Sequence, residues 1–161
     1  MLKLCQLKKT FHPGTVNEKR IFDGLSLELA PGDFVTVIGS NGAGKSTLLN
    51  AIAGVFFLDG GQIFLEGQDL TFWPEHRRSR MIGRLFQNPL LGTAPHMTIE
   101  ENLALAYLRA SHGNPLRRIS RREKEEFRSR LAALDMGLDN RMTQPVGLLS
   151  GGQRQALTLM M

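Results

Sequence analysis

Residues 39–47 read GSNGAGKST, that is, Gly39, Ser40, Asn41, Gly42, Ala43, Gly44, Lys45, Ser46 and Thr47. The stretch fits the pattern G-x-x-x-x-G-K-[ST], in which backbone amides surround phosphate groups. Glycines have no Cβ, so they let the chain turn sharply and bring its N–H groups against phosphate oxygens. Lys45 is predicted to reach the terminal phosphates, and the Ser46 hydroxyl is predicted to bind Mg²⁺.

The segments on either side of this loop have the expected patterns. Residues 34–38 (FVTVI) are apolar and β-branched and follow the turn at 31–33, which predicts a buried parallel strand. Downstream, a helix that Gly54 ends is predicted to have an apolar face made by Leu48, Leu49, Ile52 and Ala53. This context favours nucleotide binding over the alternative, a glycine-rich turn without a ligand.

Composition indicates a folded globular protein. The chain has 161 residues, 42% hydrophobic and 22% charged, which is enough for one domain with a core and argues against disorder. The longest apolar runs are too short to cross a bilayer, and the N-terminus lacks a signal-peptide pattern. We therefore expect a cytoplasmic protein that reaches a membrane only through a partner. The single cysteine, Cys5, permits no internal disulfide.

Much of the net charge of +5 comes from one basic patch, made by Arg117, Arg118, Arg121, Arg122, Lys124, Arg128 and Arg130. Such a patch can contact anionic lipid or nucleic acid, or it can be a solvated helix face. Glutamates at positions 123, 125 and 126 alternate with the bases, and no aromatic residue does. We therefore favour the solvated face and expect no nucleic-acid partner.

Alternating apolar residues predict strands at 2–7 and 25–29, with a polar loop at 12–20 between them, so an antiparallel layer is expected ahead of residues 39–47. Further strands are predicted at 62–66, which also alternates, and at 81–86. Phe11, beside this polar loop, is suited either to stack on a purine base or to anchor the core. Gln87 follows the last of these strands. Its amide oxygen can bind Mg²⁺ or contact an attacking water, or it can cap a loop.

The second half of the chain has helical signals. After a short helix behind Pro74, capping boxes at 98–101 and 120–123 predict helices that reach about Ala110 and Leu134, joined by a loop at 111–116. This helical insert, residues 95–145, differs from the α/β segment before it.

Residues 149–153 read LSGGQ, that is, Leu149, Ser150, Gly151, Gly152 and Gln153. Ser150 and Gln153 form a capping box, so the segment can be a simple helix start. However, two glycines in a first helical turn cost about 1 kcal/mol each relative to alanine, and they leave bare amides that suit an anion. We interpret this segment as a second phosphate-facing helix terminus.

The loop at 39–47, Gln87 after a strand, and LSGGQ at 149–153 occur in the order typical of one family. Over its whole length the chain resembles the ATP-binding subunit of an ABC transporter. The resemblance implies an α/β, P-loop nucleoside triphosphate hydrolase fold with an N-terminal antiparallel β layer and an inserted α-helical subdomain. It divides a single domain, 1–161, into a nucleotide-binding core (1–94), the helical subdomain (95–145) and the signature segment (146–161).

The family's site residues carry over by motif. The resemblance implies ATP and Mg²⁺ as cofactors, with Lys45 and Gln87 as candidate catalytic residues and Ser46 and Gln87 at the metal. Phe11 matches the adenine-stacking aromatic. The signature residues, Ser150, Gly151, Gly152 and Gln153, match those that contact the γ-phosphate held by the opposite subunit of a head-to-tail dimer.

The resemblance also implies partners: a second ATP-binding subunit in a homodimer, transmembrane permease subunits and an extracytoplasmic substrate-binding protein. These would hold the chain at the cytoplasmic face of the membrane. The phrases PGTVNEK and LLSGGQRQALTL resemble importer subunits of the tryptophan or tyrosine uptake type. Two alternatives remain open, a soluble ABC-type ATPase not coupled to transport and an ATP-binding module without hydrolysis.

The chain departs from the family at its end. After the signature helix the family continues into an apolar strand ending in Asp-Glu, a loop Asp and a switch His, whereas this sequence stops at Met161. We expect a truncated sequence with part of the core sheet missing, and hydrolysis only in a longer protein. The isolated 161-residue chain is expected to aggregate, because an incomplete sheet leaves an exposed edge.

Overall fold

The computed structural model describes residues 1–110 and 119–161, which form two compact units, Met1–Ile82 and Gly83–Met161. Each unit is described by itself. The predicted loop at 111–116, together with Arg117 and Arg118 of the basic patch, lies outside the described residues. The division at 94 and 145 stays a prediction.

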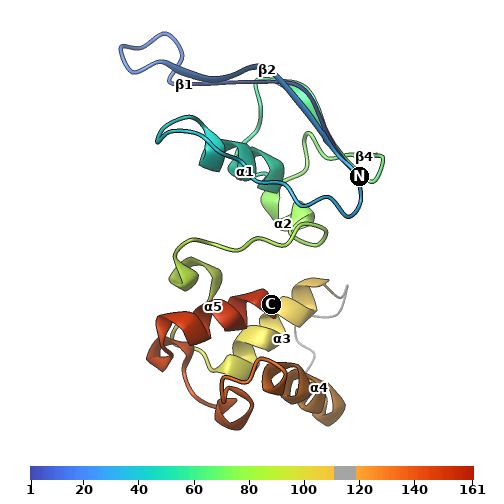
Figure 1. Cartoon of the computed structure of the whole chain (residues 1–161), viewed down its shortest axis with the longest axis vertical. Helices are drawn as coiled ribbons and strands as arrows, with labels where there is room; N and C mark the ends of the chain where they lie inside the picture. Colours follow the sequence, from blue (N-terminus) through green and yellow to red (C-terminus); the bar gives the residue numbers. More distant parts are fainter. Residues whose placement is uncertain (111–118) are drawn as a thin grey trace. The chain divides into compact units, whose positions relative to one another are not determined.

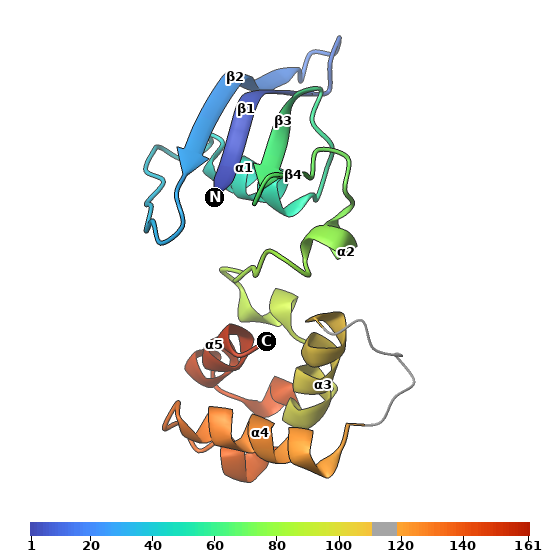
Figure 2. The same ribbon diagram turned by 90° about the vertical axis from the view of Figure 1, so that its right-hand side faces the viewer.

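The first unit is a small antiparallel sheet with a helix on one face (Figure 1). Its elements are β1 (Leu2–Phe11), β2 (Lys19–Leu29), α1 (Lys45–Ala53), β3 (Gly60–Leu65), β4 (Gln68–Asp69) and α2 (Glu75–Arg78). The strand order is β2-β1-β3-β4 with all pairs antiparallel, which confirms the predicted antiparallel layer. Figure 2 shows α1 behind this sheet. The core between them is made by Leu4, Leu7, Phe22, Leu48, Ala51, Ile63 and Leu70.

Two predicted strands, the parallel strand at 34–38 and the strand at 81–86, are not formed. Residues 34–38 and 81–86 have no strand structure, and Phe34 and Ile38 are 96% and 88% exposed. The prediction was wrong because an apolar β-branched run shows only that a segment is suited to burial. A parallel strand also needs hydrogen-bonding neighbours, and among the described residues the only sheet is the antiparallel one.

Helix α1 ends at Gly54 as predicted but has a slightly different buried face. Leu48 and Ala53 are buried as predicted, and Ala51 is fully buried against the sheet. Leu49 was predicted to belong to this face, yet it is 56% exposed. Positions 48, 51 and 52 follow the three-to-four-residue spacing of one helical face, and position 49 lies at its edge.

Arg78 joins the end of α1 to the segment that follows β4. Its guanidinium is buried, with 1% exposure, and donates to the carbonyls of Ala51, Ile52, Thr71 and Trp73 at 2.8–3.1 Å. Two of these carbonyls end α1, where a cation is favourable. Burial lowers the pKa of Arg78, and the charge of Asp69 acts in the opposite direction.

We predict that Arg78→Met lowers the free energy of unfolding of this unit by about 3 kcal/mol, because it removes charged donors and leaves buried carbonyls without partners. The measurement is urea unfolding followed by the fluorescence of Trp73, the only tryptophan. Arg77→Met is the matched control, since Arg77 is exposed. Equal unfolding midpoints for the two variants would contradict the prediction.

The second unit is helical. Its elements are η1 (Pro89–Gly92), α3 (Ile99–Ala110), α4 (Arg121–Ala132), η2 (Asp139–Arg141), η3 (Val146–Leu148) and α5 (Gly151–Leu159). Its core comprises Ile99, Leu103, Phe127, Leu131, Leu138, Met142, Val146, Leu149 and Leu157. Within the described ranges, no helix combines the length and apolar character that a membrane span requires.

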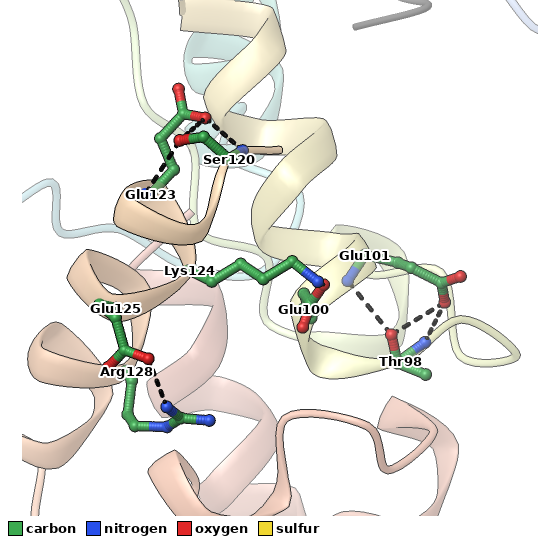
Figure 3. A network of polar contacts seen from close by, with 8 residues as sticks. All are labelled: Thr98, Glu100, Glu101, Ser120, Glu123, Lys124, Glu125 and Arg128. Atoms are coloured by element: carbon green, nitrogen blue, oxygen red, sulfur yellow. Dashed lines mark hydrogen bonds and ion pairs between the residues drawn. The ribbon is translucent and has the colours of Figure 1, made fainter. Parts of the chain in front are cut away.

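Both predicted capping boxes ahead of α3 and α4 are confirmed (Figure 3). Thr98 Oγ1 accepts from the amide of Glu101 at 3.2 Å, and the Glu101 carboxylate accepts from the amide of Thr98 at 2.7 Å. The amide and the hydroxyl of Thr98 both donate to this carboxylate, and these two bonds lower the pKa of Glu101. Ser120 and Glu123 form the same reciprocal pair at α4. A capping box involves residues only three apart, so it can be predicted from the sequence without knowledge of the tertiary structure.

The part of the basic patch that the structure describes is partly neutralised by neighbouring acids. Lys124 on α4 pairs with Glu100 on α3, and Arg128 pairs with Glu125 at 2.9 Å (Figure 3). Arg130 also forms an ion pair, with Glu126 one helical turn away. These contacts are what a solvated helix face provides.

Candidate functional site

Residues 39–47 form an exposed loop that turns into the first residue of α1. The ammonium of Lys45 bends back over the loop and donates to the carbonyls of Gly39 and Ser40 at 2.6 and 2.8 Å. The loop also closes on itself, because the amide of Ala43 donates to the Ser40 carbonyl at 3.2 Å. The lysine ammonium therefore lies against the loop backbone.

The glycines of this loop are required for different reasons. Gly42 and Gly44 have φ values of 83° and 89°, a region that favours glycine. A Cβ at Gly44 would also lie 2.8 Å from Cγ2 of Ile21 on β2, which is too close. Gly39 has no such φ, but a Cβ there would lie 3.3 Å from that of Ala43. The positive φ values favour glycine at positions 42 and 44, and the nearby side chain of Ile21 leaves no room for a Cβ at position 44.

Helix α1 begins without a side-chain cap. Its N-cap is Gly44, which makes no side-chain hydrogen bond. The first amides of an α-helix have no acceptor within the helix, and the helix dipole makes this end positive. Ser46, in the first turn, is exposed and offers its hydroxyl beside these amides. Lys45, the amides and the hydroxyl together suit a polyphosphate.

Phe11 lies at the end of β1 in an aromatic cluster. Its ring meets that of Phe56 edge-on, with 5.3 Å between centroids, and the Lys9 ammonium lies 5.4 Å from the Phe11 centroid. Asp59 fixes this lysine with a 2.7 Å ion pair and accepts from the Thr10 amide. Both hydrogen bonds lower the pKa of Asp59. Phe11 is thus held in place, and its role toward a base stays a prediction.

Gln87 is exposed, in a segment without strand structure just before η1. The cap of η1 comes from its neighbour instead, because Asn88 Oδ1 accepts from the amide of Leu90 at 3.0 Å. Asn88 therefore provides the cap of this loop, which was one of the three roles open to Gln87. Binding of Mg²⁺ or water through Gln87 stays a prediction.

The LSGGQ segment starts α5, and its capping box is present. Ser150 Oγ accepts from the amide of Gln153 at 3.3 Å, and Gln153 Oε1 accepts from the amide of Ser150 at 3.2 Å. The two glycines between them serve no packing need that the structure describes, because a Cβ at Gly151 or Gly152 would have no neighbouring heavy atom within 4 Å. Their cost in helix stability is therefore not offset by the fold itself.

Arg154 positions the segment before the signature, a contact that the sequence pattern did not reveal. Its guanidinium donates to the carbonyls of Val146, Gly147 and Leu149 at 3.0–3.3 Å. A basic residue in the first turn after the glycines was the available signal. These bonds hold the approach to Ser150 in a defined conformation.

The predicted site residues fall into two groups. Phe11 and residues 39–47 lie in the first unit, whereas Gln87 and residues 150–153 lie in the second. The structure therefore brings the loop residues together around the start of α1, and the signature residues around the start of α5.

The oxygen donors at the loop fit Mg²⁺, which prefers hard oxygen ligands and is usually held by one or two protein groups plus phosphate oxygens. The exposed Ser46 hydroxyl is such a donor. Among the described residues, no cluster of three His, Cys, Asp or Glu side chains is arranged to hold a metal.

Comparison with known proteins identifies the family. The family profile described as ABC transporter matches residues 22–161. The chain is 40% identical over 161 residues to a tyrosine transport ATP-binding protein of Clostridioides difficile (strain R20291), covering 100% of this chain and 64% of that protein. It is 37% identical over 159 residues to the spermidine/putrescine import ATP-binding protein PotA of Mannheimia succiniciproducens, covering 99% of this chain and 38% of that protein.

Solved structures agree with these sequence matches. The ATP-binding cassette MJ0796, solved as a dimer in a post-hydrolysis state with ADP and Pi, has a TM-score of 0.77 and 26% identity, covering 99% of this chain and 68% of that chain. The chain thus spans between about a third and two thirds of the length of the curated relatives it matches. With a P-loop nucleoside triphosphate hydrolase fold and matches along its whole length, this chain belongs to the ABC transporter family.

Proposed function

We propose that this chain is the ATP-binding part of an ABC importer, in which MgATP binding and hydrolysis drive solute uptake. The observation that carries this proposal is the loop itself. Lys45 is folded over Gly39 and Ser40, two left-handed glycines shape the backbone, and α1 begins without a side-chain cap. Family membership supports ATP as the polyphosphate, since the solved relative is described as bound to ADP and Pi.

Each site residue then has a role. Lys45 neutralises the β- and γ-phosphates, and the amides from Gly39 to Thr47 donate to phosphate oxygens. Ser46 and Gln87 would hold Mg²⁺, which neutralises charge on the transferred phosphoryl group when bound. Phe11 stacks on adenine. Ser150, Gly151, Gly152 and Gln153 form a second set of donors.

This second set is proposed to contact the γ-phosphate held by the partner of a head-to-tail homodimer. The open space around Gly151 and Gly152 supports the idea, because nothing described in the chain occupies the surface that their missing side chains leave. Closing and opening this dimer would be transmitted to transmembrane permease subunits at the cytoplasmic face of the membrane.

Import is favoured by the relatives. Those named for their cargo include tyrosine transport, spermidine/putrescine import and thiamine import ATP-binding proteins. An importer of this kind would work with an extracytoplasmic substrate-binding protein. The same relatives favour transport over the two alternatives, a soluble ABC-type ATPase and a module without hydrolysis.

The test is affinity purification of the tagged protein, expressed from its own gene in its own host, after detergent extraction of the membranes. We expect a multispanning membrane protein to co-purify, and the complex to hydrolyse ATP. A tagged, unrelated protein from the same cells is the control. Recovery with ribosomes and without any membrane protein would contradict the transport function.

A further inference from the structure

One face of β2 lies against loop 39–47. A Cβ built on Gly44 would lie 2.8 Å from Cγ2 of Ile21, and a Cβ on Gly42 would lie 3.7 Å from Nζ of Lys19. The pairing of β2 with β1 shifts register here, since Lys9 pairs with Phe22 and Thr10 with Arg20, so Ile21 lies at an irregularity of the strand. The two distances show that both side chains reach the loop, which places the Lys19 ammonium beside the loop backbone.

The charge of Lys19 is not neutralised within the described part of the chain. Lys19 forms no ion pair with a described residue, whereas its neighbour Arg20 pairs with Asp23 at 3.1 Å. The acid that precedes Lys19, Glu18, does not pair with it. The Glu18 carboxylate instead accepts a hydrogen bond from the amide of Gly14 at 2.6 Å. Around the start of β2, the cation that faces the loop is the one left without an anion.

The cross-strand position of Lys19 adds a second relation to the site. Its partner in the antiparallel pair with β1 is Phe11. Directly opposite residues in such a pair have neighbouring side chains. The end of the hairpin thus presents an aromatic ring next to a cation, and the same cation lies beside Gly42. This suits a ligand that combines an aromatic base with phosphate groups.

We propose that Lys19 is a second phosphate-contacting cation, which acts from β2 on the polyphosphate held by loop 39–47. This inference rests on the proposed function. Lysine carries a compact charge on a flexible four-carbon stem, so it can move from the loop surface onto a phosphate oxygen. Lys45 approaches the same loop from α1, so the two ammonium groups come from different elements and share the anionic charge.

The test compares Lys19→Gln with Lys19→Arg and with Arg20→Gln, a charge-matched control on the adjacent residue. Affinity for ATP and for inorganic tripolyphosphate is measured by calorimetry at 0.05 M and 1 M salt, with the protein expressed from its own gene. We expect Lys19→Gln to weaken both ligands about tenfold at low salt, since a charge-assisted contact is lost. Lys19→Arg should restore most of the affinity, and Arg20→Gln should match wild type.

Salt separates a charge effect from a structural one. The Debye length falls from more than 10 Å at low salt to about 3 Å at 1 M, so the defect of Lys19→Gln should shrink at high salt. Wild-type affinity of Lys19→Gln for tripolyphosphate would overturn the inference, whether or not ATP binding changes. The proposed function fails separately, if wild-type protein binds neither ATP nor tripolyphosphate.

Discussion

Lys45→Ala is expected to weaken ATP binding by at least about 100-fold, and with it any transport that the protein drives. The ammonium already lies 2.6–2.8 Å from two loop carbonyls, so a phosphate in the loop would meet a cation held in place. Charge-assisted hydrogen bonds contribute about 1.5–3 kcal/mol each, and losing two of them costs about 3 kcal/mol or more. That is roughly two orders of magnitude in Kd. Equilibrium dialysis with labelled ATP measures it.

The control for this variant is Lys3→Ala. Lys3 is an exposed lysine of the same unit that pairs with Glu28 at 3.2 Å, so its loss changes the net charge equally without touching the loop. Because residues 39–43 are exposed and none of residues 39–47 is buried, we expect both variants to unfold at the same urea concentration as wild type. Undiminished affinity of Lys45→Ala for ATP would remove the basis for assigning nucleotide binding to this loop.

The features that sequence predicted correctly are those decided within a few residues. The end of α1 follows from Gly54 and the apolar residues before it, and all three capping boxes are formed. Capping is a contact between residues three apart, so the local sequence contains all the necessary information. The antiparallel layer was also predictable, because its strands alternate over short stretches, although the register shifts within β1 and β2 were not predicted.

The predictions of strands at 34–38 and 81–86 were wrong because strand pairing is not decided by residues close in sequence. The apolar run at 34–38 is typical of a strand buried on both faces, but a strand of either segment exists only where other strands pair with it. Pairing of that kind depends on residues distant in sequence, and a local pattern does not include them. The exposed side chains of Phe34 and Ile38 in this structure follow from that absence of pairing within the described residues.

The candidate site likewise has features that the local sequence predicts and features that only the tertiary structure shows. The composition of the loop predicted a phosphate-binding backbone, but the approach of Ile21 to Gly44 and of Lys19 to Gly42 comes from packing of β2. Residues 12–20 were interpreted as a polar loop, whereas β2 begins at Lys19. A lysine in a polar stretch has no signature of its own, so only the tertiary structure places it at the site.

Ser150→Arg is expected to leave ATP binding by one subunit intact and to abolish ATP-driven dimerisation. The substitution removes the cap of α5, which costs about 1 kcal/mol, and places a bulky cation where the partner's γ-phosphate is proposed to lie. Dimerisation of the wild-type protein and of Ser150→Arg is measured by analytical ultracentrifugation in the presence of a non-hydrolysable ATP analogue.

Ser120→Arg separates the two effects of that substitution. Ser120 caps α4 with the same reciprocal Ser–acid or Ser–amide arrangement that Ser150 makes at α5, so both variants lose one capping box in the same unit. If the signature were only a helix start, the two variants would behave alike. We expect Ser120→Arg to dimerise as wild type does, because loss of the cap of α4 does not affect the proposed contact with the partner's γ-phosphate. Persistence of the ATP-driven dimer in Ser150→Arg would reduce LSGGQ to a cap and leave its two costly glycines without a function.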